Sequence, residues 1–189
     1  MTTITTEQAQ TVLHEAEMLC SAATVTAALE RLAEAISARL RDCNPLLLAV
    51  MNGGMIPTVW LLGRLDFPLQ IGYVHATRYR GTTRGGELHW LAPPPPPVKD
   101  RVVLVIDDVF DEGVTLKAIV EYLRQAGAQA VYSAVLVDKQ HDRKVPGFTV
   151  DFVGLTVTDR YVFGCGMDYH EYWSNLPAIY AIKENPASS

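Results

Sequence analysis

The chain has 189 residues, of which 49% are hydrophobic, and a formal net charge of −5 at pH 7. This composition is typical of a globular protein, and the length predicts a single domain over residues 1–189. The acidic balance argues against a general nucleic-acid binder, and no apolar run approaches the roughly 20 residues that cross a membrane. Cys20, Cys43 and Cys165 form no CxxC pair and no signal peptide is visible, so we expect a cytoplasmic protein.

The first part of the chain alternates between helical and strand-like patterns. Residues 5–8 resemble a helix start, and Val12, Ala16 and Leu19 would give that helix an apolar stripe. A second helix is predicted at residues 25–40, where leucine and isoleucine recur at helical spacing. The patterns that follow predict a strand at 46–51, a helix at 56–65 and a strand at 69–77.

Residues 77–98 form the least regular segment. They include three arginines, a Gly-Gly pair and five consecutive prolines. A proline run lacks N–H donors and favours an extended path, so we interpret it as a rigid spacer rather than a ligand of a signalling domain. The part before the prolines is expected to be a mobile flap with a hydrophobic stem.

The most informative stretch is residues 102–116. Five consecutive apolar residues predict a strand buried on both faces of a parallel sheet, and the strand runs into Asp107, Asp108 and Asp111. Open α/β sheets bind ligands at such strand ends, and the turn before the next helix offers N–H groups that suit a phosphate. Carboxylates would repel a phosphate unless a divalent cation or a hydroxyl-rich sugar lay between them. The stretch therefore predicts a site for a phosphorylated sugar with a metal.

The remaining elements complete an α/β pattern. A helix is predicted at 116–125, and strands are predicted at 130–137, 152–155 and 161–164. Alternating strands and helices imply a mainly parallel sheet flanked by helices. The chain has no GxxxxGK[ST] loop and no GxGxxG fingerprint, so a nucleoside triphosphatase or a dinucleotide enzyme is a weaker interpretation.

The central stretch resembles the signature for 5-phosphoribosyl-1-pyrophosphate in type I phosphoribosyltransferases: two acids, two apolar residues, an acid, then x-Gly-x-Thr. Residues 151–154, 159–164 and 167–172 resemble the C-terminal part of hypoxanthine-guanine phosphoribosyltransferases, and residues 46–54 resemble their pyrophosphate loop. The resemblance spans about residues 5–182. It implies the type I phosphoribosyltransferase fold, with a small hood over the base site at about residues 150–182.

The resemblance also implies how the donor is bound. Phosphoribose would be transferred to N9 of a 6-oxopurine, and pyrophosphate would leave with Mg²⁺. The acids Asp107, Asp108 and Asp168 would engage the metal, the first two also contacting the ribose hydroxyls. The residues implied for the ribose and the 5′-phosphate are Asp107, Asp108, Glu112, Gly113, Val114 and Thr115. Those implied for the pyrophosphate and the flap are Asn52, Gly53, Arg78, Tyr79 and Arg143.

The same resemblance implies a purine site. Asp111 would be the general base or proton partner of purine N7, provided that burial raises its pKa towards neutrality. Lys139 would donate to the 6-oxygen and so disfavour adenine, because an ammonium group can only donate. Tyr161 would stack on the base and Val162 would read its edge through main-chain atoms. Asp168 would lie beside them, on the pyrophosphate metal.

The chain departs from the family pattern around the pyrophosphate. Asn52 and Ser174 stand where basic residues are expected, and Glu112 brings a negative charge to the phosphate loop. Arg78 replaces the serine before the flap tyrosine, and flap arginines could compensate for the missing cations. The Asn52–Gly53 peptide is expected to be cis, as the family pattern suggests.

The leading interpretation is a purine-salvage enzyme that makes IMP or GMP. Two alternatives remain open: a xanthine-preferring relative, and a catalytically weak nucleotide-binding regulator of the same fold. The expected partners are 5-phosphoribosyl-1-pyrophosphate and a 6-oxopurine, with no nucleic acid and no membrane. A homodimer or homotetramer is what the resemblance implies for assembly.

Overall fold

The computed structural model describes residues 4–78, 88–95 and 98–183. The predicted flap residue Tyr79, and Arg80 and Arg84 with it, lie outside these ranges. Within them, no helix combines the length and the apolar character that crossing a membrane requires.

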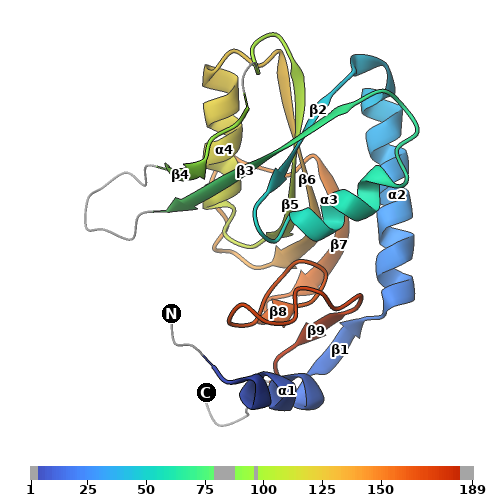
Figure 1. The fold of residues 1–189 in the computed structure, drawn as a ribbon, viewed down its shortest axis with the longest axis vertical. Coiled ribbons are helices and arrows are strands. Elements are labelled where there is room, and N and C mark those ends of the chain that lie inside the picture. The colour runs from blue at the N-terminus through green and yellow to red at the C-terminus, as the bar shows by residue number, and fades with distance from the viewer. Residues whose placement is uncertain (1–3, 79–87, 96–97, 184–189) are drawn as a thin grey trace.

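A six-stranded sheet forms the centre of the molecule, with the order β4-β3-β2-β5-β6-β7 (Figure 1). All neighbouring strands pair in parallel except β4, which is antiparallel to β3. The strands are β2 (Leu46–Val50), β3 (Gln70–Arg78), β4 (Leu88–Ala92), β5 (Val102–Phe110), β6 (Ala130–Gln140) and β7 (Phe152–Thr158). The prediction of a mainly parallel sheet flanked by helices is therefore confirmed.

Helices cover both faces of this sheet (Figure 1). The helices α2 (Ala22–Leu40) and α3 (Met55–Leu62) pack on one face, and α4 (Val114–Gln125) packs on the other. A short 3-10 helix (Arg41–Cys43) follows α2. The predicted core face of α2 is buried, namely Leu29, Leu32, Ile36 and Leu40. In β5, residues 102–106 alternate between the two hydrophobic cores, because the strand lies between both layers.

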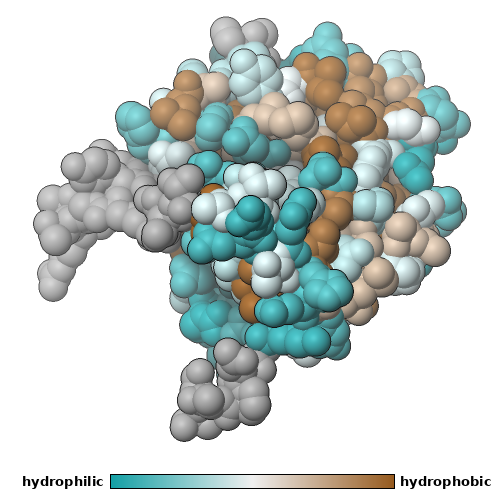
Figure 2. Space-filling model, turned by 60° about the horizontal axis from the view of Figure 1, so that its bottom comes forward, coloured by the Kyte–Doolittle hydropathy of each residue, from teal (hydrophilic) through white to brown (hydrophobic). Residues whose placement is uncertain are grey.

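A second, smaller sheet joins the two ends of the chain. Its order is β1 (Glu17–Cys20), β9 (Ile179–Ala181) and β8 (Val162–Phe163), and α1 (Thr6–Glu15) lies beside it (Figure 1). The indole N–H of Trp173 donates to the carbonyl of Ala9 in α1 at 2.8 Å. Arg160 forms an ion pair with Glu17 at 2.6 Å. Figure 2 looks towards this end of the molecule, where hydrophilic residues predominate and hydrophobic ones form only small spots.

Several sequence expectations are wrong in detail. The first helix starts as predicted, with a capping box at Thr5, but it ends at Glu15. Ala16 is extended, and Leu19 lies in β1, where it packs on the core from a strand rather than from the predicted stripe. The strand expected at 161–164 is the two-residue β8, and β1, β4 and β9 were not predicted. β1 and β9 have only four and three residues, too few to show a clear alternation, and β4 lies in the segment expected to be a flap.

Replacing Gly164 with Ala should strongly destabilise the small sheet. Gly164 has φ +101°, and a Cβ there would lie 2.1 Å from the carbonyl oxygen of Ala178. We expect a loss of about 2–3 kcal/mol in the free energy of unfolding, measured in urea. Gly147→Ala is the matched control, because its φ is +69° but no atom lies within 4 Å, and it should cost only about 1 kcal/mol. A larger loss for the control would contradict this explanation.

Candidate active site

The carboxyl end of β5 brings two acids side by side. Asp107 Oδ1 accepts the backbone N–H of Asp108 at 3.0 Å, and Asp108 Oδ1 accepts that of Val109 at 2.7 Å. Burial raises the pKa of both carboxyls, and the charge of Asp108 raises that of Asp107 further. The negative charge of Asp168 also raises the pKa of Asp108. The site therefore concentrates negative charge that a cation would relieve.

A cavity of about 540 Å³ opens beside these acids at the start of α4. Gly113 caps α4 with φ +78°, a conformation that glycine adopts without strain, and the first N–H groups of a helix have no partner within it. Such groups attract an anion. The predicted residues that line this cavity are Gly53, Asp107, Asp108, Asp111, Glu112, Gly113, Val114, Thr115 and Arg143.

A smaller cavity of about 230 Å³ adjoins the first. Both cavities share Asp108, Val109 and Asp111 in their walls. The hydroxyl of Tyr161 donates to the carbonyl of Asp168 at 3.2 Å, which connects two of the lining residues. All residues predicted to contact the purine line this cavity, namely Asp111, Lys139, Tyr161, Val162 and Asp168.

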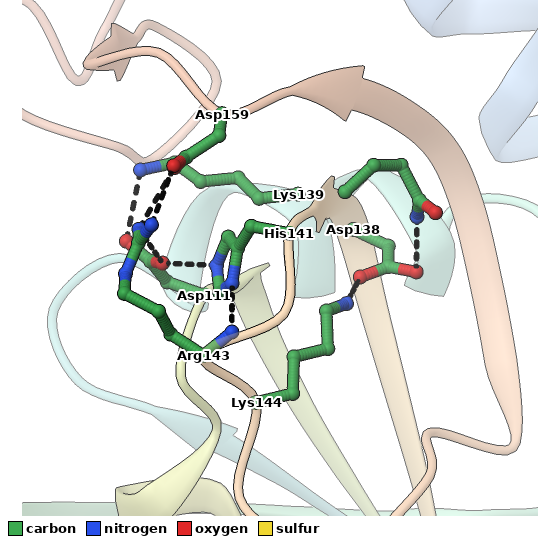
Figure 3. A network of polar contacts seen from close by, with 8 residues as sticks. Asp111, Asp138, Lys139, His141, Arg143, Lys144 and Asp159 are labelled. Carbon is green, nitrogen blue, oxygen red and sulfur yellow. Dashed lines mark hydrogen bonds and ion pairs between the residues drawn. The ribbon is translucent and has the colours of Figure 1, made fainter.

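Asp111 lies at the centre of a polar network (Figure 3). Its Oδ2 accepts from the ammonium of Lys139 at 2.8 Å, and its Oδ1 is 2.7 Å from Nε2 of His141. Burial tends to raise the pKa of Asp111, but the hydrogen bonds from Lys139 and His141, together with the charge of Lys139, outweigh it and leave the pKa below its usual value. The rise in pKa that a general base would need is therefore absent in this arrangement.

Arg143 lies at the mouth of the larger cavity. Its guanidinium makes a bidentate ion pair with Asp159, at 2.6 and 2.9 Å (Figure 3). Hydrogen bonding to Asp159 raises the pKa of Arg143, and the charges of Asp111 and Glu112 add to this. Glu112 itself is exposed, so its side chain turns towards solvent. Arg143 is the one basic side chain among the described residues that line this cavity.

Two residues of the network were missed from the sequence. His141 received no role, although it stands two residues after Lys139 at the end of β6, where side chains two apart share one face. That alternation is the signal that could have found it. Asp159 stands in the 159–164 motif, but its pairing with Arg143 joins the ends of separate strands and has no local signal in the sequence.

The pyrophosphate half of the predicted site is less complete. Met51 and Gly53 line the larger cavity, whereas Asn52 is exposed. The cis peptide lies between Met51 and Asn52, so the prediction of a cis Asn52–Gly53 bond is wrong by one residue. The turn begins at Met51, directly after β2, and the N–H of Met51 still donates to the carbonyl of Val74 in β3 at 2.8 Å. At Ser174, the other position where the family pattern has a basic residue, the described contact is a backbone one. The carbonyl of Ser174 accepts a hydrogen bond from the N–H of Gly166.

The comparisons with known proteins agree with this geometry. Residues 16–171 match the family model described as a phosphoribosyl transferase domain. The hypoxanthine-guanine-xanthine phosphoribosyltransferase of Tritrichomonas foetus is 30% identical over 157 residues, which cover 83% of this chain and 86% of that protein. The hypoxanthine-guanine phosphoribosyltransferase of Bacillus subtilis (strain 168) is 30% identical over 172 residues, 90% of this chain and 95% of that one.

A solved structure extends the likeness to the fold. A hypoxanthine phosphoribosyltransferase from Staphylococcus aureus superposes with a TM-score of 0.85 and covers 92% of this chain and 95% of its own, at 24% identity. The fold is thus that of the type I phosphoribosyltransferases. Within that class, the chain belongs to the hypoxanthine-guanine phosphoribosyltransferase family, which confirms the resemblance seen in the sequence.

Replacing Asp107 with Asn should stabilise the ligand-free protein at pH 8. Because the folded state raises the pKa of Asp107, its ionisation costs folding free energy as the pH rises above about 3.9, the ordinary aspartate value. The free energy of unfolding of the variant should exceed that of the wild type at pH 8, and the difference should shrink towards pH 4. Urea unfolding at both pH values measures this, with exposed Asp42→Asn as the control. A less stable variant at pH 8 would contradict it.

Proposed function

We propose that the protein is a purine-salvage phosphoribosyltransferase that transfers phosphoribose from 5-phosphoribosyl-1-pyrophosphate to N9 of hypoxanthine or guanine. The observation that carries this is the pair of adjoining cavities with Asp108 and Asp111 in their common wall. Two reactants bound side by side react far faster than reactants that meet in solution. The larger cavity suits the donor and the smaller one suits a flat base.

The donor half is supported by its groups. The first amides of α4 and the Thr115 hydroxyl face a cavity that would receive the 5′-phosphate, while Asp107 and Asp108 would accept hydrogen bonds from the ribose hydroxyls. Arg143 would offset negative charge near the departing pyrophosphate. Arg78 ends β3 at the edge of the flap, and we keep it as a second candidate for that task.

The acids also fit Mg²⁺. Magnesium prefers carboxylate oxygens and water, and the pKa of Asp107 and Asp108 is raised chiefly by burial and further by neighbouring carboxylates, a cost that a hard cation would relieve. Asp107, Asp108 and Asp168 are the residues that would hold it, although their ligand atoms do not all lie within 4.8 Å of one another in this structure. When bound, Mg²⁺ would neutralise charge on the leaving pyrophosphate.

The base half gives Lys139 and Asp111 linked tasks. The purine 6-oxygen would take the ammonium of Lys139 away from Asp111, whose Oδ2 would then accept the proton of purine N7 as N9 attacks the ribose. Losing its ion pair with Lys139 would raise the pKa of Asp111 at the moment when it must act as a base. Tyr161 would stack on the ring, and buried Val162 would contact its edge.

Two alternative functions can be tested by the same assay of base turnover. A xanthine-preferring enzyme would use the same groups and differ at the purine 2-position, and the Tritrichomonas foetus relative is named for xanthine as well. A regulator of this fold would bind nucleotide without turnover. The cytoplasmic location, the dimeric or tetrameric assembly, and the division of the chain into one domain with a flap and a hood stay predictions.

A four-base assay tests the proposal directly. With the donor and Mg²⁺, hypoxanthine or guanine should give nucleotide and pyrophosphate faster than xanthine, adenine should give none, and chelation of Mg²⁺ should stop the reaction. Asp111→Ala should lower kcat by about 10² or more, because it removes the proton acceptor. Product is followed by ultraviolet absorbance, with exposed Asp142→Asn as the control. Nucleotide binding without turnover of any 6-oxopurine would contradict the proposal and favour the regulator.

Replacing Lys139 with Gln should weaken discrimination at the 6-position. An amide can donate or accept, whereas an ammonium can only donate, so the penalty against a 6-amino group falls. We expect kcat/KM for hypoxanthine to drop by roughly tenfold or more and the hypoxanthine-to-adenine ratio to drop with it. The control is Lys99→Gln in an exposed turn. An unchanged ratio in the Lys139 variant would exclude Lys139 as the group that reads the 6-position.

A further inference from the structure

His141 is a nearly buried histidine in direct contact with the candidate general base. It follows the last residue of β6, and its side chain is only 4% exposed. Its Nε2 lies 2.7 Å from Asp111 Oδ1, on the opposite carboxylate oxygen from the one that Lys139 binds (Figure 3). The contact is therefore specific to one atom of Asp111.

The backbone determines which nitrogen of His141 carries the proton. The backbone N–H of Arg143 donates to His141 Nδ1 at 3.1 Å (Figure 3). A ring nitrogen that accepts a hydrogen bond carries no hydrogen, so the proton of the neutral ring is at Nε2. The Nε2–H then points at Asp111 Oδ1 and donates to it. In an imidazolium, Nδ1 would also carry a hydrogen, and this Nδ1–H would face the backbone N–H of Arg143 with no acceptor between them.

We propose that His141 is a positioning residue, an uncharged donor that holds Asp111 Oδ1 while Oδ2 is exchanged between Lys139 and the purine. This role rests on the proposed function of the site. With Oδ1 held, departure of Lys139 would leave the carboxylate aimed at the base cavity rather than free to turn away. Proton transfer depends steeply on such alignment.

The surrounding charges favour this role over a metal site. Ligand atoms of Asp111, His141 and Asp159 all lie within 4.8 Å of one another, a spacing that could hold an ion. However, Lys139 neutralises Asp111, and Arg143 occupies both carboxylate oxygens of Asp159. These cations already supply the positive charge. Besides Lys139 and Arg143, the charged groups near Asp111 that any pH effect has to include are Asp108, Asp159 and Asp168.

Two substitutions of His141 test the hydrogen bond. His141→Leu removes the donor, and His141→Gln restores an uncharged donor near the Nε2 position. We expect the Leu variant to lose about tenfold in kcat/KM for the purine with the KM for the donor unchanged, and the Gln variant to stay within about threefold. Exposed His14→Gln in α1 is the control.

The pH profile gives a readout that a merely structural role would not move. A hydrogen bond from His141 lowers the pKa of Asp111, so its loss should shift the acidic limb of kcat/KM to higher pH in the Leu variant. The Gln variant should keep the limb of the wild type, because its amide still donates. Equal losses in both variants with an unmoved limb would overturn the proposal.

The tautomer can be measured without any turnover. At pH 8, ¹⁵N NMR of the imidazole nitrogens should show the proton of His141 on Nε2, with the signal assigned by its loss in His141→Gln. A proton on Nδ1 would overturn the proposal even if the enzyme is active. If the wild type turns over no purine, the proposed function fails, while this measurement still decides whether His141 donates to Asp111.

Discussion

The repulsion between carboxylates at the end of β5 is the constraint on which the rest of the site depends. The strand is buried on both faces and pairs on both sides, with Ile106 opposite Ala49 in β2 and Ala134 in β6. A slip of one residue would exchange the two faces of the strand and carry an acid into the core. Asp107 and Asp108 are thus held together by packing, and the crowded charge makes this end of the sheet a receptor for a cation and for hydroxyl groups.

The neighbouring strands add the groups that divide the site in two. Lys139, near the end of β6, and His141, just after it, engage Asp111. The segment after β7 supplies Asp159, which holds Arg143. Around the smaller cavity, the polar side chains are therefore held by several hydrogen bonds and ion pairs. The pyrophosphate side has one basic side chain among the described lining residues, and that side chain is already paired. The distinctive chemistry of this chain is thus expected where it leaves the family pattern, at Asn52 and Ser174.

Strong local patterns were read correctly from the sequence, and contacts between distant segments were not. The apolar run of β5 and the helical spacing in α2 each determine one element through burial alone, so both were predicted. Leu19 was misread because β1 is stabilised by β9, a strand from the far end of the chain. Many of the residues that line the two cavities were assigned roles from the family resemblance, whereas Met51, Ala76 and Met167 were not. The pairing of Arg143 with Asp159 depends on tertiary geometry and has no counterpart in sequence spacing.

The small sheet also has a consequence for the order in which the protein can be built. β9 lies between β1 and β8, so the first strand of the chain has no partner until residues 179–181 have left the ribosome. At about 5–20 residues per second, that delay is on the order of 10 s. The central sheet can pair during this time, whereas Trp173 can meet α1 only after residue 173 has been made. The larger cavity, lined by residues 50–143, can therefore exist on a nascent chain before residues 161–168, which help to line the smaller cavity, have been made.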